Sequence, residues 1–126
     1  LIEEEAALDE ERPKIARVIY NRLERSIPLG IDATIVYALG GDRELTLSDL
    51  AVNSPYNTRL VLGLPPTPIS APGRASIEAA LQPAQGEWLY YVRTDESGVG
   101  SHTFAVTQED FNEAVLICVE RELGCG

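Results

Sequence analysis

The segment Glu87-Trp88-Leu89-Tyr90-Tyr91-Val92-Arg93 decides the fold class of this chain. It is rich in aromatic and β-branched residues, which are typical of a strand. The next segment, residues 95–100, carries glycine, serine and aspartate and is expected to turn. Ser101-His102-Thr103-Phe104-Ala105-Val106 is the expected partner strand. The sequence therefore predicts a β-hairpin near the C-terminal end.

The segments before the hairpin show helical periodicity. A helix over 10–24 is expected to begin at Pro13, because proline is tolerated only in the first turn of a helix. Further helices are expected over 1–8 and 74–82. A short helix should run from Asp32, as its N-cap, to Leu39, where Gly40-Gly41 ends it.

A last helix is expected over 108–122, with a Thr107-x-x-Asp110 capping pattern at its start. Its predicted apolar face holds Phe111, Val115, Cys118 and Val119. The 126 residues fit one domain over 1–126. The predicted class is α+β, with several helices packed against a small antiparallel sheet that includes the C-terminal β-hairpin.

The segment 63–73 holds four prolines and two glycines, so it can form neither an interior strand nor a helix. Loops of this length inside compact domains are usually functional or disordered. Leu64 and Ile69 alternate with the prolines and favour an ordered, packed loop.

Charge excludes one class of partner. The net charge is −10, with ten Lys and Arg against twenty Asp and Glu, so the chain repels nucleic-acid phosphates. No apolar run approaches the roughly 20 residues of a membrane span. Because Leu1-Ile2-Glu3-Glu4-Glu5 has the pattern of a helix interior, we expect a piece of a longer protein whose anchor lies upstream.

Cys118 and Cys125 stand seven residues apart at the C-terminal end. A tail that folds back would bring them within disulfide reach, which would imply an oxidising compartment. The alternative is one buried thiol and one unrelated terminal thiol. No additional His or Cys lies nearby to complete a metal site, so no metal is expected.

Glu5 is the candidate for acid chemistry. On a helical wheel of residues 1–8 it falls on one arc with Leu1, Ile2 and Leu8, while Glu3 and Glu4 point elsewhere. An apolar wall disfavours the charged form of a carboxyl, which raises its pKa into the range of a general acid. The alternative is a helix-end carboxylate with its tip in water.

Other constellations are weaker. Asp32 is explained as a helix cap, so a two-carboxylate hydrolysis scheme finds no support. There is no Gly-x-Ser-x-Gly elbow and no phosphate-loop or dinucleotide fingerprint, so no cofactor is expected. His102 is the only histidine. Tyr56-Asn57-Thr58-Arg59 offers flat rings and amides suited to N-acetyl sugars, or simply turn residues.

Taken together, these segments resemble the YceG-like endolytic murein transglycosylase family over nearly the whole chain. The resemblance rests on the ordered succession of Leu1-Ile2-Glu3-Glu4-Glu5-Ala6, Ala16-Arg17-Val18-Ile19-Tyr20-Asn21-Arg22-Leu23, Asp32-Ala33-Thr34-Ile35-Val36-Tyr37, Ser54-Pro55-Tyr56-Asn57-Thr58, Gly63-Leu64-Pro65-Pro66-Thr67-Pro68-Ile69 and Ser101-His102-Thr103-Phe104. Ala71-Pro72-Gly73, Ala79-Ala80 and Pro83 complete it.

The resemblance implies a lytic transglycosylase that cleaves the β-1,4 bond between N-acetylmuramic acid (MurNAc) and N-acetylglucosamine (GlcNAc). Glu5 matches the family's catalytic acid and Glu3 the first glutamate of the same motif, with a supporting role. Peptidoglycan strands are the implied substrate, wall-synthesis proteins are candidate partners, and the action is at the extracytoplasmic face of the membrane. Further glycan contacts are expected from Tyr56, Asn57, Thr58, His102 and Phe104.

Two positions depart from the family pattern. Ala33 stands where the family often has proline, and Gly30 where a polar residue is frequent. The family's membrane anchor and LysM-like region have no counterpart in these 126 residues, so the isolated chain could bind glycan poorly. A non-catalytic peptidoglycan-binding module and a hydrolytic muramidase are the competing hypotheses.

Overall fold

The computed structural model describes residues 1–94, 100–123 and 125. Within them the predicted α+β class is confirmed, because helices surround a two-stranded antiparallel sheet. In chain order the elements are α1 (Ile2–Glu5), the 3-10 turn η1 (Asp9–Glu11), α2 (Arg12–Glu24), α3 (Asp32–Ala38), the 3-10 turn η2 (Asp49–Ala51), α4 (Arg74–Leu81), β1 (Tyr90–Arg93), β2 (His102–Ala105) and α5 (Gln108–Glu120).

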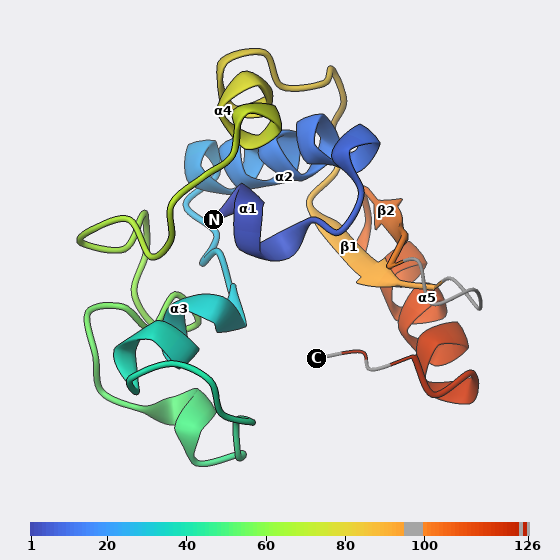
Figure 1. Cartoon of the computed structure of the whole chain (residues 1–126). Coiled ribbons are helices and arrows are strands. Elements are labelled where there is room, and N and C mark those ends of the chain that lie inside the picture. The colour runs from blue at the N-terminus through green and yellow to red at the C-terminus, as the bar shows by residue number, and fades with distance from the viewer. Residues whose placement is uncertain (95–99, 124, 126) are drawn as a thin grey trace.

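Helix α2 is the central element. Figure 1 shows it crossing the molecule between α4 and α1, with the hairpin and α5 at one end and α3 at the other. Pro13 lies in its first turn, as expected. Ile15 and Ile19 of α2 pack with Ala6, Leu29 and Ile31, and Ile15 is fully buried. This cluster is the core against which α1 and the hairpin pack.

Helix α1 is shorter than the helix expected over 1–8. The chain leaves helical geometry at Ala6, whose φ of −99° and ψ of 128° are extended. The Ala6 side chain is buried in the α2 core, and the chain turns again at η1 before α2 begins. Glu5 is therefore the last helical residue before a bend.

The hairpin has the expected order, with Tyr91 opposite Phe104 and Arg93 opposite His102. The predicted turn at 95–99 lies outside the described residues. Strand β1 begins three residues later than the expected 87–93. The carbonyl groups of Gly86 and Trp88 accept hydrogen bonds from Asn21 Nδ2 (3.1 and 3.0 Å), so this backbone is held by α2 rather than by a neighbouring strand.

The prediction that Asp32 is an N-cap is wrong. Asp32 is the first residue of α3, Ile31 is the cap, and no side chain caps the helix. The Asp32 carboxylate instead binds Arg59, which is 27 residues further along and invisible to local capping rules. The predicted end of α3 is confirmed: Gly40 and Gly41 have φ of 98° and 86°, which favour glycine.

The proline-rich loop follows η2 and leads into α4. Ile69 is half-buried, whereas Leu64 is 63% exposed, so the predicted packing of this loop holds for only one of the two side chains. The loop is tied to α3 by Tyr56, whose hydroxyl pairs with Thr67 Oγ1 at 2.8 Å and whose ring lies 5.2 Å from that of Tyr37.

Helix α5 closes the other side of the hairpin. Ala114 and Cys118 are buried against Val92 of β1, with Val115 partly buried beside them. Val119, predicted for the same face, is 60% exposed and does not belong to this cluster, so the prediction is wrong for this residue. Cys118 and Cys125 are joined by a disulfide, with 5.9 Å between their Cα atoms.

The Thr107 cap of α5 offers the first test. Thr107 Oγ1 accepts a hydrogen bond from the backbone nitrogen of Asp110 at 3.2 Å. Thr107→Ala should lower the free energy of unfolding by about 1 kcal/mol, as measured by chemical denaturation, because this amide loses its partner. Thr107→Ser keeps the oxygen and should stay close to wild type. Equal stability of both variants would show that the cap contributes nothing.

Candidate active site

Glu5 projects from the end of α1 into two adjoining pockets. The first, called here the Arg59 pocket, is lined by Glu4, Glu5, Arg22, Leu29, Gly30, Asp32, Ala33, Arg59, Tyr91 and Phe111. The second, called here the His102 pocket, is lined by Glu4, Glu5, Tyr91, Val92, Arg93, His102, Phe111 and Cys125. Glu5 and Tyr91 belong to both, so the carboxyl stands where the two pockets meet.

The environment of Glu5 raises its pKa from 4.5 to about 7. Burial is the main cause, because an apolar surrounding disfavours the charged carboxylate. A hydrogen bond from Tyr91 acts in the opposite direction by stabilising that charge, and the negative charge of Asp32 raises the pKa further. Near neutral pH a substantial fraction of Glu5 is thus protonated and can donate a proton.

Tyr91 donates the hydrogen bond to the buried carboxyl of Glu5. It lies in the middle of the hairpin, and its ring packs against the α2 core. The ring centroids of Phe104 and His102 lie 5.8 and 5.3 Å away, the latter in an edge-to-face arrangement. Burial and the hydrogen bond to Glu5 raise the pKa of Tyr91 well above 10, so the phenol remains a donor.

His102 enters the second pocket from β2. Its Nδ1 lies 3.0 Å from Glu11 Oε1, and its backbone nitrogen donates to Glu11 Oε2 at 2.8 Å. The two side chains are only 9% and 11% exposed. His102 and Glu5 thus line the same pocket, and the residue that holds His102 in place, Glu11, is absent from the sequence-based site.

Glu3 points away from Glu5. Its Oε2 accepts hydrogen bonds from Ser76 Oγ of α4 and from Arg12 Nη1 of α2, the latter at 3.1 Å. The hydrogen bond from Ser76 and a second from the Gly73 backbone lower the pKa of Glu3. Glu3 therefore links three helices, and it lines neither of the two pockets that Glu5 enters.

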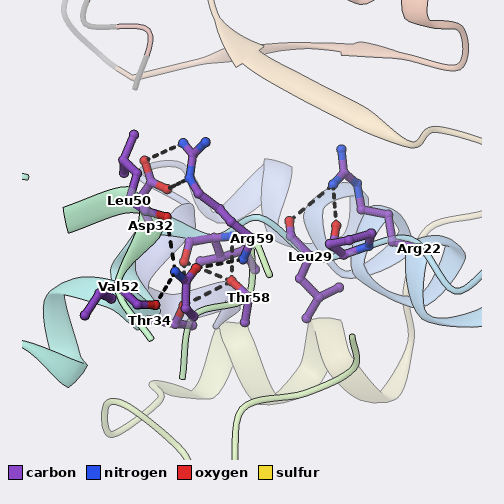
Figure 2. A network of polar contacts seen from close by, with 11 residues as sticks. Arg22, Leu29, Asp32, Thr34, Leu50, Val52, Thr58 and Arg59 are labelled. Carbon is purple, nitrogen blue, oxygen red and sulfur yellow. Dashed lines mark hydrogen bonds and ion pairs between the residues drawn. The ribbon is translucent and has the colours of Figure 1, made fainter. Parts of the chain in front are cut away.

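Asn57 and Thr58 are fully buried rather than open to a ligand. Asn57 Nδ2 donates to the carbonyl oxygens of Leu50 and Val52, at 3.1 and 2.9 Å. Thr58 Oγ1 accepts from the backbone nitrogen of Ile31 at 2.9 Å and pairs with Thr34 Oγ1. Figure 2 shows this network directly beneath the ion pair that lines the Arg59 pocket.

That ion pair joins Asp32 and Arg59. Arg59 Nε and Nη2 donate to the two carboxylate oxygens of Asp32, at 2.7 and 3.1 Å. Across the pocket, Arg22 uses its guanidinium to bind the carbonyl oxygens of Leu89 (2.6 Å) and Pro28 (2.7 Å). The latter contact, with a longer one to Leu29, appears on the right of Figure 2. Arg22 thus holds the backbone of the pocket wall, whereas Arg59 holds the Asp32 side chain.

Tyr56 and Phe104 lie apart from Glu5. Tyr56 belongs to neither pocket that contains the acid, and its hydroxyl is engaged by the proline loop. The Phe104 ring lies beside Trp88, at 5.9 Å, and beneath Lys14 Nζ, at 5.5 Å. The structure brings together Glu5 and His102 from the predicted set, and it adds Tyr91. Tyr91 lies two register positions from the Arg93–His102 pair of the hairpin.

Neither a metal nor a membrane span is indicated in the part of the chain that the structure describes. No cluster of three or more His, Cys, Asp or Glu side chains there could hold a metal ion. Among the described helices, none has both the length and the apolar character that crossing a bilayer requires.

Comparison with known proteins points to one family. The sequence profile of the YceG-like family matches residues 1–116. A relative from Bacillus subtilis (strain 168), named endolytic murein transglycosylase, is 43% identical over 115 residues, which are 90% of this chain and 31% of that protein. A relative of the same name from Streptococcus pneumoniae serotype 2 (strain D39) is 35% identical over 129 residues, or 98% of this chain and 23% of its own length.

A solved structure agrees with the family match. The crystal structure of a yceG-like protein from Listeria monocytogenes has a TM-score of 0.82 and 43% sequence identity to this chain. The match covers 89% of this chain and 36% of that one. The chain spans less than a third of the length of each of the two named relatives.

The raised pKa of Glu5 makes a prediction about stability. Well below pH 4.5 the carboxyl is neutral in both the folded and the unfolded state. As the pH rises from 4.5 to about 7, the unfolded state ionises first, so the free energy of unfolding falls, by roughly 3 kcal/mol in total. Glu5→Gln keeps the shape but cannot ionise, so it should be more stable than wild type at pH 8.

Denaturation of wild type and Glu5→Gln at pH 4, 6 and 8 tests this. The difference between the two proteins cancels every other titrating group and should grow with pH up to about pH 7, then level off. Glu10→Gln, which changes an exposed glutamate outside both pockets, is the control and should show no such trend. A pH-independent difference for Glu5→Gln would contradict the raised pKa.

Asn57 offers a separate test of the pocket wall. Asn57→Ala should lower the free energy of unfolding by about 1–3 kcal/mol, because two carbonyl groups and the Arg59 backbone nitrogen lose their partner. Asn53→Ala removes an exposed asparagine four residues away and serves as the control. Equal stability of the two variants, measured by thermal denaturation, would show that the Asn57 contacts are not stabilising.

Proposed function

This chain belongs to the YceG-like family, and we propose that it carries the catalytic centre of an endolytic peptidoglycan lytic transglycosylase. The bond cleaved is the β-1,4 bond between MurNAc and GlcNAc, and the product ends are 1,6-anhydro-MurNAc. One observation carries the proposal: a carboxyl with a pKa of about 7, that of Glu5, stands where two pockets meet. The named relatives support the substrate class.

The first step is proton donation. Glu5, neutral near pH 7, donates its proton to the glycosidic oxygen as the bond to the anomeric carbon breaks. The carboxylate that results is stabilised by the hydrogen bond from Tyr91, which does not depend on the substrate. Burial favours the neutral Glu5 carboxyl before proton donation, and the Tyr91 phenol stabilises the Glu5 carboxylate afterwards. Glu5 can therefore act first as the acid and then as the base.

The second step is ring closure. The Glu5 carboxylate takes the proton from the 6-hydroxyl of the muramoyl residue, and that oxygen attacks the anomeric carbon. A 1,6-anhydro ring forms, and Glu5 regains its proton. Because the nucleophile belongs to the substrate, one ionisable carboxyl suffices. Asp32, the other carboxylate of the Arg59 pocket, is held in a two-point ion pair with Arg59, which agrees with a scheme that uses a single free acid.

The two pockets give the glycan a place on both sides of the reacting bond. The Arg59 pocket lies on one side of Glu5 and the His102 pocket on the other, and both are open to solvent. A site open on two sides can accept a bond inside a strand, which is what an endolytic enzyme requires. Residues 1–126 act in this proposal as one catalytic domain. Peptidoglycan lies outside the membrane, so the action is extracytoplasmic, and wall-synthesis proteins remain candidate partners.

The test is product analysis with glycan strands as substrate. Wild-type protein should release fragments ending in 1,6-anhydro-MurNAc, which mass spectrometry separates from reducing ends by the loss of one water. Glu5→Gln should abolish these products, a loss of at least about 10²-fold, because the general acid is removed. The variant should retain its fold by circular dichroism.

Glu10→Gln is the matched control and should retain cleavage, since Glu10 is exposed and lines neither pocket. Reducing-end products from the wild type would show hydrolysis and overturn the transglycosylase mechanism. Strand binding without cleavage, equal in wild type and Glu5→Gln, would indicate a non-catalytic binding module instead.

A further inference from the structure

Glu11 and His102 form a buried pair in the wall of the His102 pocket, and the mechanism above does not use it. They come from sequence positions 91 residues apart, η1 and the start of β2. Their side chains are about nine-tenths buried. In the described part of the chain, Glu11 has no Lys or Arg ion pair, since the neighbouring Arg12 binds Glu3 and Asp9.

The hydrogen-bond pattern fixes the position of the imidazole proton. A carboxylate can only accept hydrogen bonds. Glu11 Oε2 accepts from the backbone nitrogen of His102, and Oε1 lies 3.0 Å from Nδ1. Nδ1 must therefore carry the proton, and in the neutral ring Nε2 is left with a lone pair.

The orientation of the ring is set as well. Tyr91 meets the imidazole edge-to-face at an interplanar angle of 88°. With Nδ1 turned to Glu11, Nε2 has no hydrogen-bond partner among the described residues, although the side chain is only 9% exposed. A buried polar atom without a partner in a pocket wall is a site prepared for a ligand group.

We propose, on the basis of the function proposed above, that Glu11 is a positioning residue that presents His102 Nε2 as an acceptor to a sugar hydroxyl next to the bond that Glu5 cleaves. A neutral imidazole nitrogen needs a donor, and hydroxyl groups are the donors that a glycan offers in greatest number. Glu5 and His102 line the same pocket, so one sugar bound there can contact both residues. The pair therefore helps to set which sugar face meets the acid.

The other explanation of this pair is a purely structural tie between η1 and β2. His102→Asn separates the two, because the asparagine amide nitrogen can occupy the place of Nδ1 and still donate to Glu11, whereas nothing replaces Nε2. The inference predicts a folded protein whose cleavage efficiency, kcat/KM, falls roughly 10- to 100-fold through the lost hydrogen bond. His102→Asn that cleaves glycan at the wild-type rate overturns it.

Glu11→Gln provides a second, independent variant. The glutamine oxygen must accept from the fixed backbone N–H of His102, which leaves the amide NH2 facing Nδ1. Nδ1 then becomes the acceptor and the proton moves to Nε2. The prediction is a switch of the histidine tautomer, seen in the ring nitrogen chemical shifts of a ¹⁵N NMR spectrum, together with a loss of cleavage similar to that of His102→Asn.

The wild-type spectrum at a pH where the ring is neutral completes the experiment. A proton on Nδ1 supports the inference, and a proton on Nε2 overturns it, whether or not the protein cleaves glycan. If wild-type protein releases no anhydro ends, the proposed function itself fails. If it releases them and His102→Asn does so equally well, only the role of the pair fails.

Discussion

The burial of one carboxyl group beside a phenol is the constraint on which the site depends. Glu5 ends a helix of four residues, and a helix so short has no stability of its own. It is held by the α2 core on one side and by the bond from Glu3 to α2 and α4 on the other. The contacts that offset the cost of burying the Glu5 carboxyl are thus made by neighbouring residues that take no part in the proposed reaction.

In the rest of the site too, buried structural residues hold the residues that line the pockets. Buried amides and hydroxyls at Asn57 and Thr58 hold the wall of the Arg59 pocket, and buried guanidinium contacts of Arg22 hold its rim. The hairpin supplies Tyr91 to the acid and His102 to the His102 pocket from pairs that stand two positions apart in the register. Polar residues whose chemistry suits a sugar, such as Asn57 and Thr58, can therefore stabilise the pocket wall without contacting a ligand.

Sequence reasoning finds what depends on local pattern. The α+β class, the first turn at Pro13, the α4 helix, the Thr107 cap and the burial of Glu5 all agree with periodicity and capping rules. It fails where a long-range contact overrides a local signal. The local sequence predicts Asp32 as a helix cap, but its Oδ1 accepts a hydrogen bond from Arg59 Nε at 2.7 Å. The local sequence likewise predicts Glu11 as a solvated residue at a helix start, but its carboxylate pairs with His102.

The burial of Asn57 and Thr58 could not be predicted from local sequence either. Their residue types suit both a turn and a sugar-binding surface, and only the positions of Leu50, Val52 and Ile31 decide between a ligand and the backbone as partner. The two-residue period of the strand could have placed Tyr91 on the same face of the hairpin as its partner Phe104, but it could not have shown the hydrogen bond from Tyr91 to Glu5.

The most direct test of the account is the ionisation of Glu5 itself. In a ¹³C NMR titration of the side-chain carboxyl carbons, the signal missing from the Glu5→Gln spectrum identifies Glu5. The account predicts that this signal titrates with a midpoint near pH 7. A midpoint near the ordinary 4.5 would mean that the carboxyl is ionised and solvated at neutral pH, and that it cannot serve as the proton donor.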